Sequence, residues 1–369
     1  MNVSPPPPVG RCLDMCPMRE CKEREQQGRL FRFETLVGEG NWARGRCKMR
    51  SLPLADPSKT VKEYSRPAAG KKLSSPCDLR PPSVLLKTVN YLLMEVWDHV
   101  NERDLASLAE AYIFVFDRLR AVRQDLTVQR IQGRLGAFVL EGSLGFLLCA
   151  PYLVRDLPSD SYDEVLHAKQ VRDCFADLME CYGMDPKCPR EAEFQALLLL
   201  YDLGNMDTIN RALKLPRGVG DSPQVQIALA VNRAYLEGNW VRLFRLVHQL
   251  DCLQACSFYR HLPNARDNAL RVLTHAYSSR NCRFPLDLLV VLLAIDTTGM
   301  ASEMCRRRGL AVISGEKQSV VFFKASFKDS GPECAGREYI LIETKRGDFT
   351  WAEIMMGENE GEFMRPKTN

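Results

Sequence analysis

The feature that most constrains the fold is a helical hydrophobic period, which continues from Val84 to about Arg280 with no strand-like alternation. Within it, apolar side chains recur at three- and four-residue intervals, as in Leu105, Leu108, Tyr112, Phe116, Leu119, Val122 and Leu126. Such spacing gives a helix one apolar face, which must be buried against another element. The sequence therefore predicts a mainly α protein.

Two segments within this region resemble each other and lie 34 residues apart (201 to 235), namely Tyr201-Asp202-Leu203-Gly204-Asn205 and Tyr235-Leu236-Glu237-Gly238-Asn239. In each segment a Gly follows a helical pattern, where a left-handed cap is favoured. The offset equals the tetratricopeptide period. We predict stacked helical hairpins from about Glu191 to Arg280.

The period changes near Pro285, which can open a helix over 286–295. Thr298 can cap a second helix, 299–308. Strand-like composition follows at 311–313, 319–327 and 339–344. A helix, a turn, a helix and a small sheet describe a winged helix.

The predicted fold is therefore mainly α, with stacked helical hairpins of the TPR or PCI type followed by a C-terminal winged helix with a small β-sheet. The predicted domains are an N-terminal arm rich in Pro, Gly and basic residues (1–83), a helical-repeat domain (84–283), a winged-helix domain (284–350) and a flexible tail (351–369). The arm has one predicted helix, 19–36.

Composition excludes several classes of protein. The Pro-rich start, residues 1–10, has no apolar stretch, so we expect no secretory signal and read the 14 cysteines as intracellular thiols, mostly in the core. The apolar segment 135–154 is interrupted by Glu141 and Pro151, which favours a buried, kinked helix over a membrane span.

Catalytic motifs are absent from the sequence. The five histidines are isolated, and no phosphate-binding loop or nucleophile elbow occurs. We predict no enzyme, no cofactor and no small-molecule substrate. Cys12, Cys16, Cys21 and Cys47 could form a thiolate zinc site, but their spacing is wider than that of paired zinc knuckles. We instead expect Met15 and Cys16 to anchor the arm on the helical core, with Pro17 opening a helix.

Basic residues gather in two places. The 50 basic residues barely exceed the 46 acidic ones, so binding of RNA or DNA would need a local patch. One candidate patch lies in the arm and comprises Arg44, Arg46, Lys48, Arg50, Lys59, Lys62, Arg66, Lys71 and Lys72. A solvated arm or a dock for an acidic partner explains it equally well. The second candidate is Arg306, Arg307 and Arg308, which could contact a partner or nucleic acid, or compensate the helix dipole.

Several blocks of the sequence resemble a known family. The opening motif comprises Cys12, Asp14, Met15, Cys16 and Pro17, and it is followed by Tyr64 and Arg66 and by a helical block with Asp117, Arg118, Arg120 and Arg123. In order and content these blocks resemble the GANP-type family of messenger-RNA export scaffolds, which share the Sac-three homology domain. From their positions on the helix, we expect the three arginines to pair with Asp117, Asp125 or a neighbouring helix rather than to contact phosphate.

The resemblance implies a non-enzymatic adaptor in the nucleus and cytoplasm that docks a PCI-type winged-helix subunit and a small acidic companion protein. The sequence departs from the family pattern at Leu13, at Cys21 and in the apolar segment 135–154, which leaves the partners open. The chain resembles a short stand-alone member without the centrin-binding helix of longer members, so centrin is not an expected direct partner. The alternative is a centrosome- or spindle-associated factor in centrosome duplication and mitotic progression.

Overall fold

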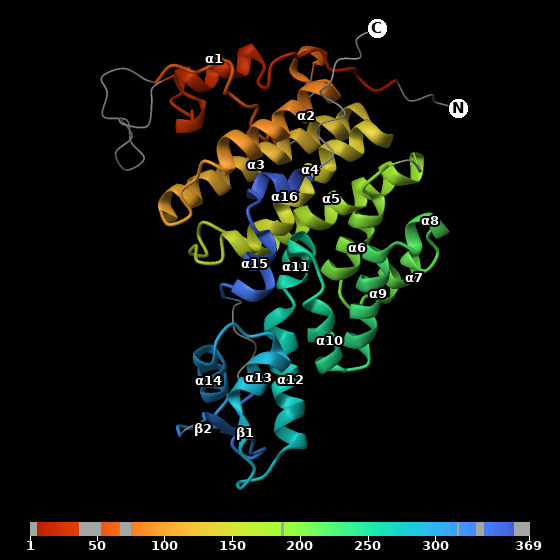
Figure 1. Cartoon of the computed structure of the whole chain (residues 1–369). Coiled ribbons are helices and arrows are strands. Elements are labelled where there is room, and N and C mark those ends of the chain that lie inside the picture. Colours follow the sequence, from red (N-terminus) through yellow and green to blue (C-terminus); the bar gives the residue numbers. More distant parts are fainter. Residues whose placement is uncertain are drawn as a thin grey trace. The chain divides into compact units, whose positions relative to one another are not determined.

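The computed structural model describes residues 6–36, 53–66, 75–185, 188–315, 317–329 and 336–357. These residues are mainly helical and include one three-stranded sheet (Figure 1), so the mainly α prediction with a small sheet is confirmed. The chain divides into two compact units. Unit 1 comprises residues 1–150, 156–188 and 350–369, and unit 2 comprises residues 151–155 and 189–349.

This division differs from the predicted domain boundaries. The predicted arm belongs to the same compact unit as the helices that follow it, and the predicted helical-repeat domain is divided near residue 188. Unit 1 contains the following helices, including a π-helix (η4) and two short 3-10 helices (η1 and η3): α1 (Met18–Gln26), η1 (Arg32–Glu34), η3 (Pro76–Asp78), α2 (Pro82–Asn90), η4 (Tyr91–Trp97), α3 (Leu105–Gln129), α4 (Gly133–Leu153, of which residues 151–153 belong to unit 2), α5 (Glu164–Met184) and α16 (Trp351–Met356).

The core of unit 1 is built around α4, in which every residue from 141 to 150 is buried. Of the described helices, α4 is the one that is long and apolar enough by itself to cross a membrane, and 83% of its apolar window is buried inside the protein. His167 on α5 links α4 to α3 through two hydrogen bonds. Its Nε2 donates to the Leu147 carbonyl (2.7 Å), so its Nδ1 accepts from the Tyr112 hydroxyl (3.0 Å).

The first helix of the arm is shorter than predicted. The helix α1 ends at Gln26, and Gly28 adopts a left-handed conformation (φ +62°). The Arg29 amide then donates to the Arg24 carbonyl (2.9 Å), a pattern that closes a helix. The arm continues through η1, so the predicted helix over 19–36 is wrong in its second half.

The predicted flexible tail also needs correction, because residues 351–356 form α16. Trp351, Ala352, Met355 and Met356 are buried. The Thr350 hydroxyl accepts from the Glu353 amide (3.2 Å), and the Glu353 carboxylate accepts from the Thr350 amide (2.7 Å), which is a capping box. Residues 358–369 lie outside the described residues.

Unit 2 begins with helices and ends with the sheet and two short helical turns, of which η5 is a π-helix. Its elements are α6 (Glu191–Tyr201), α7 (Met206–Ala212), α8 (Arg217–Gly220), α9 (Pro223–Leu236), α10 (Trp240–Val247), α11 (Cys252–Tyr259), α12 (Leu262–Ala276), β1 (Phe284–Pro285), α13 (Leu286–Leu293), α14 (Thr298–Arg307), β2 (Ala311–Ile313), β3 (Ser319–Val321), η5 (Tyr339–Glu343) and α15 (Thr344–Arg346).

The two similar segments have the same local structure. Gly204 and Gly238 both have positive φ (+79° and +64°). Each is followed by an Asn that caps the next helix: Asn205 accepts from the Asp207 amide (2.9 Å), and Asn239 accepts from the Arg242 amide (3.0 Å). The predicted left-handed positions are confirmed, and each segment turns one helix into the next.

The sheet has the strand order β1-β3-β2, with both pairs antiparallel. Between β1 and β2, the helices α13 and α14 meet at a bend of 92°. The predicted strand over 339–344 is wrong, because these residues form η5 and the start of α15. The Asp296 carboxylate accepts from the amides of Tyr339 (2.6 Å) and Ile340 (2.8 Å), which fixes the first turn of η5. The strand β3 also ends at Val321, earlier than predicted.

Candidate functional site

The opening motif lies against the helices of unit 1. Cys12, Met15 and Cys16 are buried, and the Met15 carbonyl accepts from the Lys62 amide (3.0 Å) and from Arg80 Nη1 (3.2 Å). The Cys12 amide donates to the Leu79 carbonyl (2.9 Å). Asp14 is exposed, and Pro17 directly precedes α1. The expectation that Met15 and Cys16 anchor the arm is therefore confirmed.

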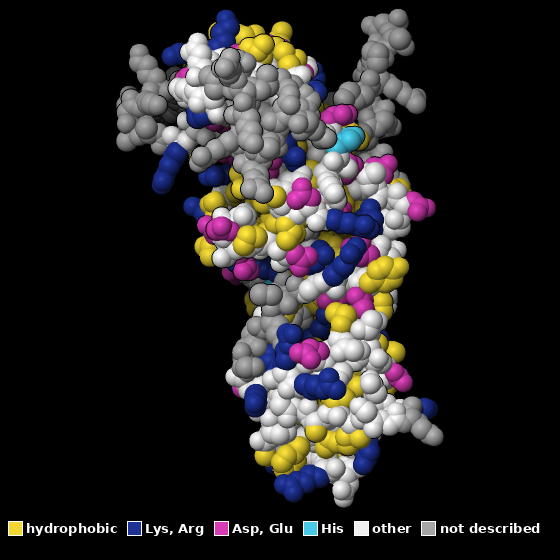
Figure 2. Space-filling view, turned by 90° about the vertical axis from the view of Figure 1, so that its left-hand side faces the viewer, with side chains coloured by type: hydrophobic (Ala, Val, Ile, Leu, Met, Phe, Trp, Pro, Cys, Tyr) yellow, Lys and Arg dark blue, Asp and Glu magenta, His cyan; other side chains and the backbone are white. Residues whose placement is uncertain are grey.

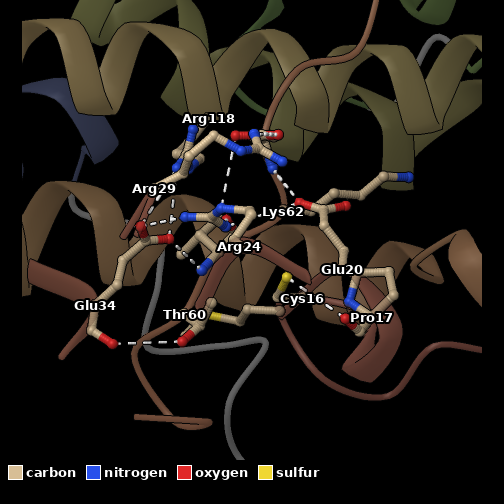
Figure 3. A network of polar contacts seen from close by, with 12 residues as sticks. Cys16, Pro17, Glu20, Arg24, Arg29, Glu34, Thr60, Lys62 and Arg118 are labelled. Carbon is tan, nitrogen blue, oxygen red and sulfur yellow. Dashed lines mark hydrogen bonds and ion pairs between the residues drawn. The ribbon is translucent and has the colours of Figure 1, made fainter. Parts of the chain in front are cut away.

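A buried ion cluster fixes the arm to α3 (Figure 3). The carboxylate of Glu34 forms ion pairs with Arg24 and, at 3.4 Å, with Arg118, and the side chains of Arg24 and Glu34 have no exposed surface. Glu34 also accepts from the amides of Phe31 (3.1 Å) and Val61 (3.1 Å). Two cations and two amides around one carboxylate satisfy a charge that would be costly to bury alone.

Burial raises the pKa of two groups at the edge of this cluster, Glu20 and Cys16. Glu20 lies 3.7 Å from Arg24 and accepts from the Glu63 amide (2.8 Å), yet burial raises the pKa of its carboxyl. Burial likewise raises the pKa of the Cys16 thiol well above its usual range. A neutral thiol is a poor nucleophile and metal ligand, so Cys16 contributes to packing.

A second buried carboxylate, Asp125, lies further along α3. Its two oxygens contact Lys62 Nζ (2.7 Å) and Arg80 Nε (2.7 Å). Lys62 Nζ also donates to the Asp78 carbonyl (2.6 Å). The prediction of Lys62 as a partner or nucleic-acid contact is therefore wrong, because its charge is buried and paired within unit 1.

Further polar residues of α3 contact the extended segment 60–66 and the helix α5. Asp117 pairs with Arg118 and accepts from the Tyr64 amide (3.1 Å), while the Arg120 guanidinium lies 3.9 Å from the centroid of the Tyr64 ring. Arg123 donates to the Gln170 carbonyl of α5 (3.1 Å). The predicted pairing thus holds for Arg118, with Asp117, and for Arg123, with α5, whereas Arg120 stacks on Tyr64 of the arm.

Of the candidate basic patch in the arm, the described residues that remain exposed are Lys59 and Arg66. The Lys59 ammonium is 4.0 Å from Asp56, at the limit of an ion pair. Lys71 and Lys72 lie outside the described residues, as do Arg44, Arg46, Lys48 and Arg50. On the face drawn in Figure 2, Lys and Arg side chains are interspersed with Asp and Glu and form no single basic patch among the described residues.

The three arginines at the end of α14 have different environments. Arg306 is exposed, and Arg307 is exposed but lies 2.9 Å from Glu303 on the same helix. Arg308 is buried, and its Nη2 is 2.6 Å from Asp267 on α12. Arg308 therefore belongs to the interior of unit 2, which corrects its prediction as a contact residue.

A half-open cleft of about 340 Å³ lies beside these arginines, between α12 and α14. Met300 and Met304 contribute its apolar surface. At one end Arg266 pairs with Glu338 (2.5 Å) and donates to the Leu293 carbonyl (3.1 Å), and burial raises the pKa of Glu338. The other charged residues that line the cleft are also paired, Asp267 with Arg308 and Glu303 with Arg307. The cleft therefore has no separate charged subsite.

The described residues contain no group of three or more His, Cys, Asp or Glu side chains arranged to hold a metal ion. Cys12 and Cys16 donate weakly to nearby backbone carbonyls, at 3.3 Å and 3.7 Å. Cys47 lies outside the described residues.

Sequence reasoning missed the residues at the centre of the anchor. Arg24, Glu34 and Arg80 are not among the predicted site residues. A charged residue in the sequence carries no sign of its own burial, because its partners are distant: Glu34 and Arg118 are 84 positions apart.

The opening motif also marks the start of the family match. The model of the SAC3/GANP family matches residues 15–314, from the buried Met15 to just beyond β2. The chain belongs to the SAC3/GANP family. The suspected resemblance is thereby confirmed.

Full-length relatives of this SAC3/GANP chain have similar sequences over most of its length. It is 29% identical over 377 residues to SAC3 family protein 1 of Schizosaccharomyces pombe and 28% identical over 361 residues to Protein xmas of Drosophila melanogaster, each match covering 95% of the chain. SAC3 family protein B of Arabidopsis thaliana is 29% identical over 72% of the chain. The chain spans only 35%, 16% and 15% of these relatives.

Proposed function

We propose that this SAC3/GANP chain is a non-enzymatic scaffold subunit of an assembly related to messenger-RNA export, and that it acts by docking partner proteins. The family match over residues 15–314 carries this proposal. The buried ion pairs of unit 1 support it, because the charges of Lys62, Glu34 and Arg118 are used to fix the arm on α3 and not to form an open catalytic centre among the described residues.

The stacked hairpins and the winged helix are the finer parts of the proposal. The order α12, β1, α13, α14, β2 and β3, the strand order β1-β3-β2 and the 92° bend between α13 and α14 support a winged-helix module in unit 2. The repeated Gly–Asn turns before α7 and α10 support TPR- or PCI-like hairpins ahead of it.

The partner we propose is a PCI-type winged-helix subunit, accompanied by a small acidic protein. Arg306 and Arg307 support the C-terminal end of α14 as part of the docking face, since both are exposed and an acidic surface would complement them. RNA or DNA is the second ligand. The exposed Lys317, Lys324 and Lys328, together with Arg306, support a phosphate contact on the same module.

The cellular address that fits this proposal is the nucleus and cytoplasm. The centrosome and spindle alternative gains no support from the family or from the relatives named above, and centrin is not proposed as a partner.

Charge reversal at the exposed arginines tests the docking face. Arg306→Glu combined with Arg307→Glu should abolish co-purification of the winged-helix partner, whereas Arg211→Glu combined with Arg217→Glu, on exposed positions of the hairpins, should leave it unchanged. Arg308 is excluded because its reversal would place two carboxylates together in the interior. Equal recovery of the partner by both double variants would contradict the proposed face.

A further inference from the structure

The helix α16 lies on α4 where α4 has glycines. A Cβ atom at Gly145 would be 2.4 Å from the Met355 carbonyl oxygen and 2.9 Å from the Met355 Cα. A Cβ atom at Gly142 would be 2.8 Å from the Met356 sulfur. The backbone of α16 therefore approaches the backbone of α4 at a distance that only glycine permits.

Two acidic residues before α3 bind the start of α16. Asp98 accepts from the Ala352 amide (3.0 Å), and Glu102 accepts from Trp351 Nε1 (3.0 Å). The first of these bonds satisfies a helix N-terminal amide that has no partner within its own helix. The surface that α16 contacts thus provides hydrogen-bond acceptors for the N-terminal end of α16 and two glycines that allow close contact along the side of α16.

The helix itself is short and bounded by glycines. It has six residues, between Gly347 (φ +59°) and Gly357 (φ +74°), and residues 347–350 before it are all exposed. A single helix of this length is not stable alone in water. Its helical form therefore depends on the burial of Trp351, Ala352, Met355 and Met356 against unit 1.

We propose that Gly142 and Gly145 of α4, with Asp98 and Glu102, form a helix-binding groove that this chain fills in cis with α16 as a detachable strap. The groove fits a short helix with Trp at its first position, a small residue at its second and Met at its fifth and sixth. When the strap opens, the rest of unit 1 keeps its fold and the groove becomes available.

Hydrogen exchange of the full chain tests the strap. In Gly145→Ala, the added methyl group displaces α16, while alanine favours the helical form of α4 itself. We expect amides 351–356 to exchange at least about tenfold faster than in the parent chain, with α3 and α5 unchanged. The matched control is Gly183→Ala on α5, where a Cβ meets nothing within 4 Å. Unchanged exchange at 351–356, or an equal loss of protection in α3 and α5, would overturn the proposal.

A peptide experiment tests the groove. A fluorescent peptide of residues 348–357 is titrated onto the full chain carrying Trp351→Ala, which loses the main anchor of its own strap. We expect saturable one-to-one binding that the parent chain does not show and that the same peptide with Trp351→Ala lacks. Absence of binding to the folded variant would overturn the proposal. Failure of the variant to fold would also overturn it, since loss of a detachable strap leaves unit 1 intact.

Discussion

Glu34 and Asp125 each lie between two cations inside unit 1, and together they explain how the arm is fixed. Glu34 pairs with Arg24 and Arg118, and Asp125 pairs with Lys62 and Arg80. Desolvating a carboxylate is costly unless charges and donors surround it. Because three cations come from separate parts of the arm (Arg24, Lys62 and Arg80) and the fourth, Arg118, comes from α3, the two clusters define one arrangement of these parts.

Glu34→Gln should destabilise unit 1 by about 3–5 kcal/mol, because it leaves buried arginines without their counter-charge. The exposed Glu23→Gln on α1 is the control and should change stability by less than about 0.5 kcal/mol. Urea denaturation of both variants measures the difference. A loss below about 1 kcal/mol for Glu34→Gln would show that the cluster does not stabilise the arm.

His261 gives unit 2 a pH dependence. Its Nε2 donates to the Tyr201 carbonyl (2.7 Å), and burial lowers its pKa to about 4. The unfolded side chain has a pKa near 6.5, so between about pH 6.5 and 4 the unfolded state binds a proton that the folded state does not. Stability should therefore fall as pH falls through this window, by up to about 3 kcal/mol.

His261→Gln retains an amide donor but does not titrate, so it should remove this part of the pH dependence. Urea midpoints at pH 7, 5.5 and 4.5 measure it, with the exposed His275→Gln as the control. The same loss of stability at low pH in His261→Gln and in the parent chain would exclude His261 as its source.

Side-chain exposure is the aspect that the sequence predicted least well at this scale. The burial of Met15 and Cys16 was predicted because apolar side chains beside a helix signal normally pack. Lys62 and Arg308 were predicted as contact residues, but each is buried beside a carboxylate far along the chain, Asp125 or Asp267. Only the folded structure brings these charges together.

The turns between helices are the elements that the sequence predicted best. Gly204 and Gly238 were assigned left-handed conformations because a Gly that follows a helical pattern is typical of a helix end, and both have positive φ. The local backbone conformation alone favours glycine at these positions, since any side chain is strained at positive φ whatever the distant contacts are.

These two glycines provide a matched pair of substitutions. Gly238→Ala should cost about 1 kcal/mol, because a Cβ meets nothing within 4 Å and only the positive φ is unfavourable. Gly204→Ala should cost more, because its Cβ would lie 2.8 Å from the Tyr235 ring. Thermal unfolding of both variants compares them. Equal losses would mean that Tyr235 moves aside without cost.

The sheet was harder to predict, because its strands are short and its pairing is non-local. Residues 339–344 have the composition of a strand, but Asp296, 43 positions before Tyr339, binds their first amides and starts a helix. The strand β1 has only two residues, Phe284 and Pro285, and pairs with β3. Neither feature has a periodicity that sequence analysis could detect.

At the scale of the whole molecule, the family and the broad fold of the chain are established and its mode of action is proposed. Membership of the SAC3/GANP family and a mainly helical fold with a small sheet are established. Docking of a winged-helix subunit, contact with nucleic acid and a role related to messenger-RNA export are proposals. Because the chain spans about a third or less of the relatives named above, the functions of those whole proteins do not transfer to it directly.

The most direct test of the central claim is affinity purification of the tagged chain from dividing cells, with and without nuclease, followed by mass spectrometry. The account predicts that a PCI-type winged-helix subunit and its small acidic companion are recovered in equal amounts under both conditions, because proteins and not nucleic acid hold the assembly together. Loss of both proteins after nuclease treatment, or recovery of centrosomal and spindle proteins in their place, would contradict it.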